Sequence, residues 1–69
     1  MKYREVEKKL RKLGCIDLKS KGGSHRKWIN PIAERGAPVP DWGSKDLKMG
    51  TLRAAVKQLG LDWDDFIAA

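Results

Sequence analysis

The sequence predicts an α+β fold of two layers, in which a three-stranded antiparallel sheet carries two helices on one face, in the order α-β-β-β-α. Three observations lead to this prediction. Apolar residues recur with helical spacing near both ends of the chain, and short segments between them alternate with the period of strands. The 69 residues also suffice for only one core, so we expect a single domain over residues 1–69.

The first segment, residues 2–13, predicts an amphipathic helix. Its apolar side chains are three or four residues apart, which places them on one stripe, while charged residues fill the other faces. Gly14 is expected to end this helix. The residues of the stripe are Tyr3, Val6, Leu10 and Leu13.

Two strands joined by a hairpin are expected next. In residues 15–20, Ile16 and Leu18 alternate with charged residues, which is the pattern of a half-buried strand. Residues 21–23 supply a turn, and so short a connection permits only antiparallel pairing with a second strand over residues 24–30. One face of that second strand carries Arg26 and Trp28, and the other carries His25, Lys27 and Ile29.

The C-terminal half predicts an edge strand and two helices. Pro38 and Pro40 lack the N–H that a central strand needs, so a strand over residues 37–40 should be short and lie at the sheet edge. A second helix is expected from residues 50–51 to Gly60, and Asp62 can cap a short final helix. The residues expected to pack inward are Leu52, Ala55, Val56 and Leu59 in the second helix, and Leu61, Trp63, Phe66 and Ile67 around the last.

Positive charge is concentrated in the first half of the chain. The net charge is +6, but residues 1–30 carry ten basic and three acidic side chains, whereas residues 31–69 carry five and six. A one-sided positive field suits a polyanion such as nucleic acid, because each phosphate that is neutralised releases counterions. It is also what a solvated lysine-rich surface looks like.

Composition excludes several classes of protein. The single cysteine, Cys15, cannot form an internal disulfide, and one cysteine with one histidine gives no metal-ligand cluster. We therefore expect no metal and no cofactor. The sequence has neither an apolar leader nor an apolar run that could span a membrane, so we expect a cytoplasmic protein without a membrane partner.

The predicted order of elements matches the double-stranded RNA-binding domain in outline, and three segments narrow the choice. Residues 21–25 (KGGSH) fall in the hairpin, the Val39-Pro40 step follows, and residues 45–53 (KDLKMGTLR) open the second helix. Together they resemble the HicA toxin family, over nearly the whole chain from Tyr3 to Leu61.

This resemblance implies an activity and a partner. HicA proteins are small ribonucleases of toxin–antitoxin modules that cut mRNA, and the resemblance implies a HicB-type antitoxin. The family's active histidine stands in its Gly-Ser-His motif, which corresponds to His25 here. Many members carry a second histidine or a small polar residue directly after this motif, and another histidine shortly after the Val-Pro step. This chain has Arg26 and Lys27 at the first place, and Asp41 and Trp42 at the second.

RNA can be cleaved without metal when its own 2′-hydroxyl attacks the adjacent phosphorus, so the enzyme needs only to move protons and stabilise negative charge. His25 is the only imidazole of the chain and can act as the general base. The proton for the leaving 5′-oxygen must come from water, from Lys21 or Lys27, or from a protonated His25 with another group as base. The residues leave this choice open.

The expected RNA contacts surround His25 and the start of the second helix. Each residue type also has a purely structural explanation: glycines allow the backbone conformation of a turn, a serine can cap the local backbone, and lysines can form a solvated sheet edge. All three types also suit phosphate binding. The residues assigned to RNA binding are Lys19, Lys21, Gly23, Ser24, Arg26, Lys27, Lys48 and Arg53.

Two other functions remain open. Because the additional family histidines are missing, the chain could be an RNA-binding module of the same fold without turnover. Trp42 lies in an expected loop, where packing in the core explains a large aromatic side chain less easily. A protein-interaction domain is therefore a third hypothesis. Trp28 is expected to pack in the core rather than stack on a base.

Overall fold

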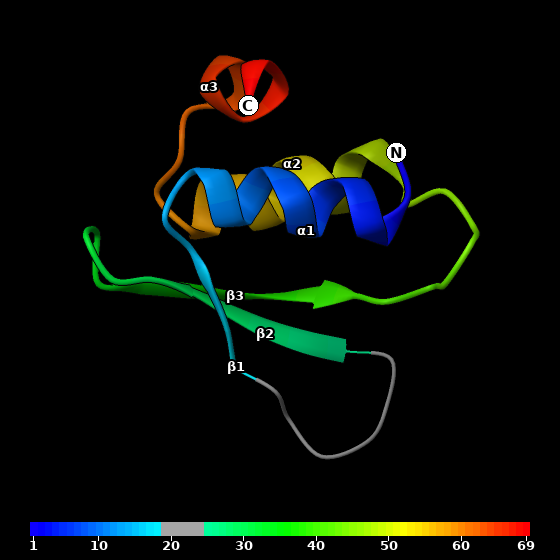
Figure 1. Cartoon of the computed structure of the whole chain (residues 1–69), viewed down its shortest axis with the longest axis horizontal. Helices are drawn as coiled ribbons and strands as arrows, with labels where there is room; N and C mark the ends of the chain where they lie inside the picture. The colour runs from blue at the N-terminus through cyan, green and yellow to red at the C-terminus, as the bar shows by residue number, and fades with distance from the viewer. Residues whose placement is uncertain (19–24) are drawn as a thin grey trace.

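Three strands and three helices make up the part of the chain that the structure describes. The computed structural model describes residues 1–18 and 25–69, with only the backbone of His25. The elements are α1 (Tyr3–Lys12), β1 (Ile16–Leu18), β2 (His25–Asn30), β3 (Arg35–Pro40), α2 (Met49–Gln58) and α3 (Trp63–Ala68). The strands form one antiparallel sheet in the order β1-β2-β3. Helices α1 and α2 lie on the same face of this sheet (Figure 1), which confirms the predicted α+β architecture.

The final helix adds a partial third layer. Helix α3 lies on the side of α1 and α2 that faces away from the sheet (Figure 1) and contacts both of them. Its first backbone N–H groups are capped as predicted, because Asp62 Oδ1 accepts hydrogen bonds from the amides of Asp64 (2.9 Å) and Asp65 (3.2 Å). At its other end, Lys9 Nζ on α1 donates to the carbonyls of Ile67 (2.8 Å) and Ala69 (2.9 Å). A lysine of the first helix therefore fastens the last one.

Strand register decides which side chains face the helices. Trp28 pairs with Asp17 on β1 and with Ala37 on β3, and these three positions point toward the helical layer. Trp28 and Ala37 are fully buried, and the side chain of Asp17 is only 3% exposed. The alternation predicted for β1 is thus confirmed, and the side chain that it buries is the aspartate. Ile16 and Leu18 lie on the open face of the sheet, 47% and 44% exposed.

The core lies between the inner face of the sheet and the helices. Tyr3, Val6 and Leu10 of the predicted α1 stripe are buried, while Leu13 is only partly buried. Each large apolar side chain removed from water contributes about 1.5–3 kcal/mol of transfer free energy. Cys15 is buried in this core as expected, and burial raises the pKa of its thiol. The largest fully buried side chains are Trp28, Phe66, Leu10, Leu52, Leu59, Val6 and Val39.

The beginning of β3 differs from the prediction. Strand β3 begins at Arg35 rather than at residue 37, because Arg35 and Gly36 extend the ladder opposite Asn30 and Ile29. The β2–β3 turn is therefore short, and Glu34 takes a left-handed conformation in it with φ of 55°. The helix ends predicted at Gly14 and Gly60 are confirmed. Both residues have a positive φ, 88° and 70°, at which a residue with a Cβ atom would be strained.

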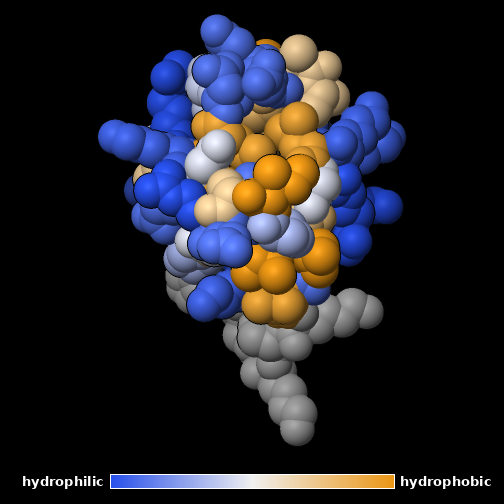
Figure 2. Space-filling model, turned by 90° about the vertical axis from the view of Figure 1, so that its left-hand side faces the viewer, coloured by the Kyte–Doolittle hydropathy of each residue, from blue (hydrophilic) through white to orange (hydrophobic). Residues whose placement is uncertain are grey.

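The two ends of the molecule differ in character. Figure 2 looks at the end that carries the β2–β3 turn, where apolar atoms gather in the middle between hydrophilic flanks. Ile32, in this turn, is 87% exposed. The opposite end holds the beginning of β2, the end of β3 and the beginning of α2 (Figure 1).

Candidate functional site

His25 is the first residue of β2, and its backbone pairs with Pro40, the last residue of β3. The segment 41–48 and the N-terminus of α2 lie at the same end of the sheet (Figure 1). The structure therefore brings the predicted catalytic position and the beginning of α2 to one end of the molecule.

Exposed lysines are found at this end. Lys27 is exposed two residues after His25 along β2, but its side chain lies beside Gly36, toward the β2–β3 turn. Lys48 is exposed at the N-cap position of α2, and Lys45 is exposed in the preceding segment. The N-terminus of α2 adds the positive end of the helix dipole. This end of the molecule can attract a phosphate-bearing ligand.

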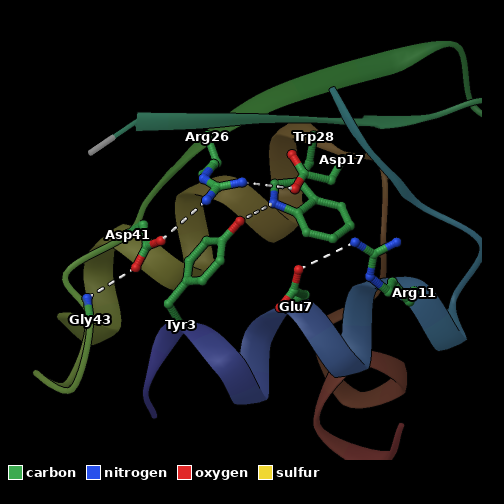
Figure 3. Close-up of polar contacts among 8 residues, drawn as sticks. All are labelled: Tyr3, Glu7, Arg11, Asp17, Arg26, Trp28, Asp41 and Gly43. Atoms are coloured by element: carbon green, nitrogen blue, oxygen red, sulfur yellow. Dashed lines mark hydrogen bonds and ion pairs between the residues drawn. The ribbon is translucent and has the colours of Figure 1, made fainter. Parts of the chain in front are cut away.

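Arg26 lies on the other face of β2 and is held between two carboxylates (Figure 3). Its guanidinium is 3.4 Å from Asp17 Oδ2 and 3.8 Å from Asp41 Oδ2. The side chain of Arg26 is 37% exposed, while that of Asp17 is 3% exposed and its Oδ1 atom has no hydrogen-bond partner. The charge of Arg26 is therefore directed toward the helical layer and neutralised there.

A buried polar contact lies beside this ion pair (Figure 3). The indole Nε1–H of Trp28 donates to the hydroxyl of Tyr3 at 3.0 Å. Burial raises the pKa of the Tyr3 hydroxyl, although the hydrogen bond from Trp28 acts in the opposite direction. Arg11 lies 5.3 Å from the centre of the Trp28 ring and pairs with Glu7 at 3.3 Å. These contacts confirm the expected core role of Trp28.

The segment between β3 and α2 is fixed by backbone contacts rather than by regular structure. The amide of Leu47 donates to the carbonyl of Met1 at 2.9 Å, and Lys2 forms a bridge with Asp46. The carboxylate that holds Arg26 also accepts a hydrogen bond, since Asp41 Oδ1 receives the Gly43 amide at 3.0 Å. Lysines 45 and 48 are thus carried on a segment that is tied to the two residues before α1 and to β2.

Arg53 is placed differently from the other predicted RNA contacts. Its guanidinium lies 4.5 Å from the centre of the Trp63 ring, at the beginning of α3. Such a cation–π contact stabilises the docking of α3 on α2. The structure thus places Arg53 on the α3 side of α2, apart from the sheet end where β2 begins.

Several expectations lie outside the described residues. They concern the hairpin turn and the sites at Lys19, Lys21, Gly23 and Ser24. Within residues 1–18 and 25–69, the histidine, cysteine and acidic side chains form no cluster that could hold a metal ion. Over the same residues, every helix is too short or too polar to cross a membrane.

Sequence reasoning did not foresee the ion pair between Asp17 and Arg26. The signal was present, because the aspartate lies between two apolar residues of a short strand, and the face of the next strand that carries its register partner Trp28 also carries Arg26. Alternation alone cannot tell which face of a strand is buried, and the apolar Ile16 and Leu18 suggested the opposite face. The buried amide of Asn30, whose Nδ2 donates to the Leu59 carbonyl at 2.7 Å, was equally unforeseen.

Comparison with known proteins now identifies the family. A family model described as the HicA toxin of bacterial toxin–antitoxin systems matches residues 3–61 of the 69-residue chain. No curated protein and no solved structure matches the chain. The matched residues include α1, the whole sheet and α2, so they contain every element that forms the candidate site. The chain therefore belongs to the HicA toxin family, and it is a toxin whose expected counterpart is the antitoxin of such a system.

Proposed function

We propose that this toxin is a metal-independent endoribonuclease that cleaves mRNA, with His25 in proton transfer. The observation that carries the proposal is the position of His25, which opens β2 at the end of the sheet where Lys45 and Lys48 are exposed. Membership of the HicA family supports it independently. A polyanion drawn to these lysines would lie at the end of the sheet where β2 begins.

His25 acts as the general base that takes the proton from the attacking 2′-hydroxyl of the RNA. A second group must protonate the leaving 5′-oxygen, because one imidazole cannot do both in one step. Water, Lys21 and Lys27 are the candidates for this task. Lys27 is exposed two positions along the same strand, but its side chain lies beside Gly36, toward the β2–β3 turn, so it has to swing back toward His25 to donate this proton.

RNA contact is assigned first to the lysines. Lys48 is exposed at the site end, and Lys27 is exposed on β2. The hairpin positions Lys19, Lys21, Gly23 and Ser24 are proposed as further contacts. Arg26 is engaged by carboxylates on the inner side of β2, and Arg53 is stacked on Trp63. Both arginines therefore act on RNA mainly by holding the scaffold.

The antitoxin is proposed to be of the HicB type and to cover the same end of the molecule. Because Lys45 and Lys48 are exposed there, electrostatic complementarity favours an acidic contact surface on the antitoxin. Binding at this end would keep RNA away from His25 by occupation of the site alone. Mutation of Lys45 or Lys48 to alanine is then expected to slow association with the antitoxin, more at low salt than at high salt.

The test is cleavage of an mRNA in the presence of a chelator by the wild type and by His25→Ala. We expect cleavage by the wild type and a loss of at least about 100-fold in His25→Ala. A matched pair on α2 tests the charge argument, since Lys48 and Lys57 are both exposed but lie at opposite ends of that helix. Lys48→Ala should weaken RNA binding, and Lys57→Ala should not. Equal cleavage by the wild type and His25→Ala would overturn the proposal.

A second candidate function is RNA binding without turnover, and the observation that favours it is the single histidine of the chain. It predicts salt-dependent RNA binding that His25→Ala leaves nearly unchanged. Cleaved product and growth arrest on expression would both be missing. The same chelator assay decides between the two functions.

A further inference from the structure

An open groove follows the free edge of β3, between this strand and α2. Its volume is about 360 Å³. In the described part of the chain β3 pairs only with β2, so its other edge is free along the groove. The lining is apolar on the strand side and carries two polar side chains on the helix. The lining residues are Pro38, Pro40, Trp42, Thr51, Ala54, Ala55 and Gln58.

The aromatic wall of this groove is held in place. Trp42 is half-buried and packs against the hydrophobic core, and its carbonyl accepts the Lys45 amide at 3.2 Å. The residue before it, Asp41, is fixed by the Arg26 guanidinium and by the amide of Gly43. The indole is therefore carried by a constrained segment, so less conformational entropy is lost when a ligand stacks on the ring.

The groove begins beside the proposed catalytic position. Pro40 lines it and is the register partner of His25, and Trp42 lies two residues further, at most about 7 Å along the chain. On the helix side, Thr51 and Gln58 are seven residues apart and share one stripe of α2, and Lys48 is the N-cap residue of this helix. The exposed lysines 45 and 48 thus stand at the same end of the groove as His25.

We propose that this groove binds one nucleobase of single-stranded RNA. Trp42 stacks on the base, Thr51 and Gln58 offer hydrogen bonds to its edge, and Lys48 contacts the neighbouring phosphate. An aromatic platform flanked by cations is the usual arrangement for single-stranded nucleic acid. The inference rests on the proposed ribonuclease function and deepens it, because the base bound here is the one next to the bond that is cut.

The chemistry of the edge argues against a protein strand as the occupant. A partner strand pairs with a free edge through main-chain N–H and C=O groups. Pro38 and Pro40 are two residues apart in β3, so their nitrogens face the same edge of the strand. A strand that keeps its ladder with β2 accommodates proline where the missing N–H would face outward. This edge can offer a partner strand few donors, whereas a stacked base needs none.

The test uses the full chain as His25→Ala, so that RNA is bound and not cut. The probe is a labelled single-stranded oligoribonucleotide, together with a series that carries one abasic site at each position in turn, and binding is followed by fluorescence anisotropy. We expect Trp42→Ala to weaken binding about 5- to 100-fold and Trp42→Phe to weaken it much less. The slope of log affinity against log salt should stay unchanged in both, because no phosphate contact is lost.

The abasic series locates the base and supplies the decisive comparison. One abasic position should weaken binding to the His25→Ala chain by the same factor as Trp42→Ala, and it should cause no further loss when Trp42 is already alanine. Ile32→Ala is the matched control, because it removes an exposed apolar side chain at the other end of the molecule and should leave RNA binding unchanged. Gln58→Leu, on exposed helix surface, should alter the preference among bases without changing the salt slope.

The outcomes separate this proposal from the ribonuclease function. Uniform tolerance of abasic sites, or equal losses with and without Trp42, would overturn the base-binding groove even if the wild type cleaves RNA through His25. Loss of antitoxin binding alone in Trp42→Ala would assign the groove to a protein and overturn it too. Stacking at one position together with no cleavage by the wild type would uphold the groove and refute the enzyme.

Discussion

Arg26→Met is expected to destabilise the fold strongly, because it leaves the carboxylate of Asp17 buried without its ion partner. That carboxylate is 3% exposed, and one of its oxygens already has no hydrogen-bond partner. Removal of one member of a fully buried ion pair costs about 3–5 kcal/mol. Since Arg26 is 37% exposed, we expect a smaller loss, about 2–3 kcal/mol. A domain of this size has a total stability of only about 3–10 kcal/mol.

The assay is urea unfolding followed by tryptophan fluorescence, with a thermal melt as a second measure. The expected loss corresponds to a fall in Tm of about 10–20 °C. The double variant Asp17→Asn/Arg26→Met should recover most of the loss, because it removes both charges. Asp41→Asn should cost less than about 1 kcal/mol, since this carboxylate is 3.8 Å from the guanidinium and 29% exposed. An Arg26→Met variant within about 0.5 kcal/mol of the wild type, or no recovery in the double variant, would refute the reasoning.

Three further outcomes follow from buried contacts. Tyr3→Phe deprives the Trp28 indole of its acceptor at 3.0 Å and should cost about 1–3 kcal/mol in urea unfolding. Lys9→Met frees the last carbonyls of α3, so amides of this helix should exchange faster in hydrogen-exchange measurements, while those of β2 keep their protection. The raised pKa of buried Cys15 predicts slow alkylation of the native chain. Its contribution to stability is present below the unfolded thiol pKa and is lost as the pH rises through the higher folded value.

Local rules were enough for the elements of the fold, because each rests on a short pattern. The stripe that begins at Tyr3, the glycines at 14 and 60, and the cap at Asp62 were all predicted from spacing or residue type. The first residue of β3 was harder to predict, since the hydrogen-bonded pairing of two strands extends as far as the partner strand allows. Arg35 and Gly36 join it through pairing that no local propensity encodes.

The candidate site divides in the same way. The motif containing His25 and the alternation of Arg26 with Lys27 were readable in the chain, and the structure confirms that these two cations lie on opposite faces of β2. The partners of Arg26 were not readable, because Asp17 and Asp41 come from two other segments and meet it only after the sheet has formed. The groove beside Trp42 likewise depends on how α2 crosses β3, which is a tertiary property.

The most direct test of the central claim is the chemistry of the ends that the wild-type toxin leaves on RNA in chelator. Attack by the 2′-hydroxyl, with His25 as base, predicts a 2′,3′-cyclic phosphate on one fragment and a 5′-hydroxyl on the other. It also predicts that a single 2′-deoxy substitution at the cut site abolishes cleavage there. Products with a 3′-hydroxyl and a 5′-phosphate, or undiminished cleavage at the 2′-deoxy site, would contradict the account.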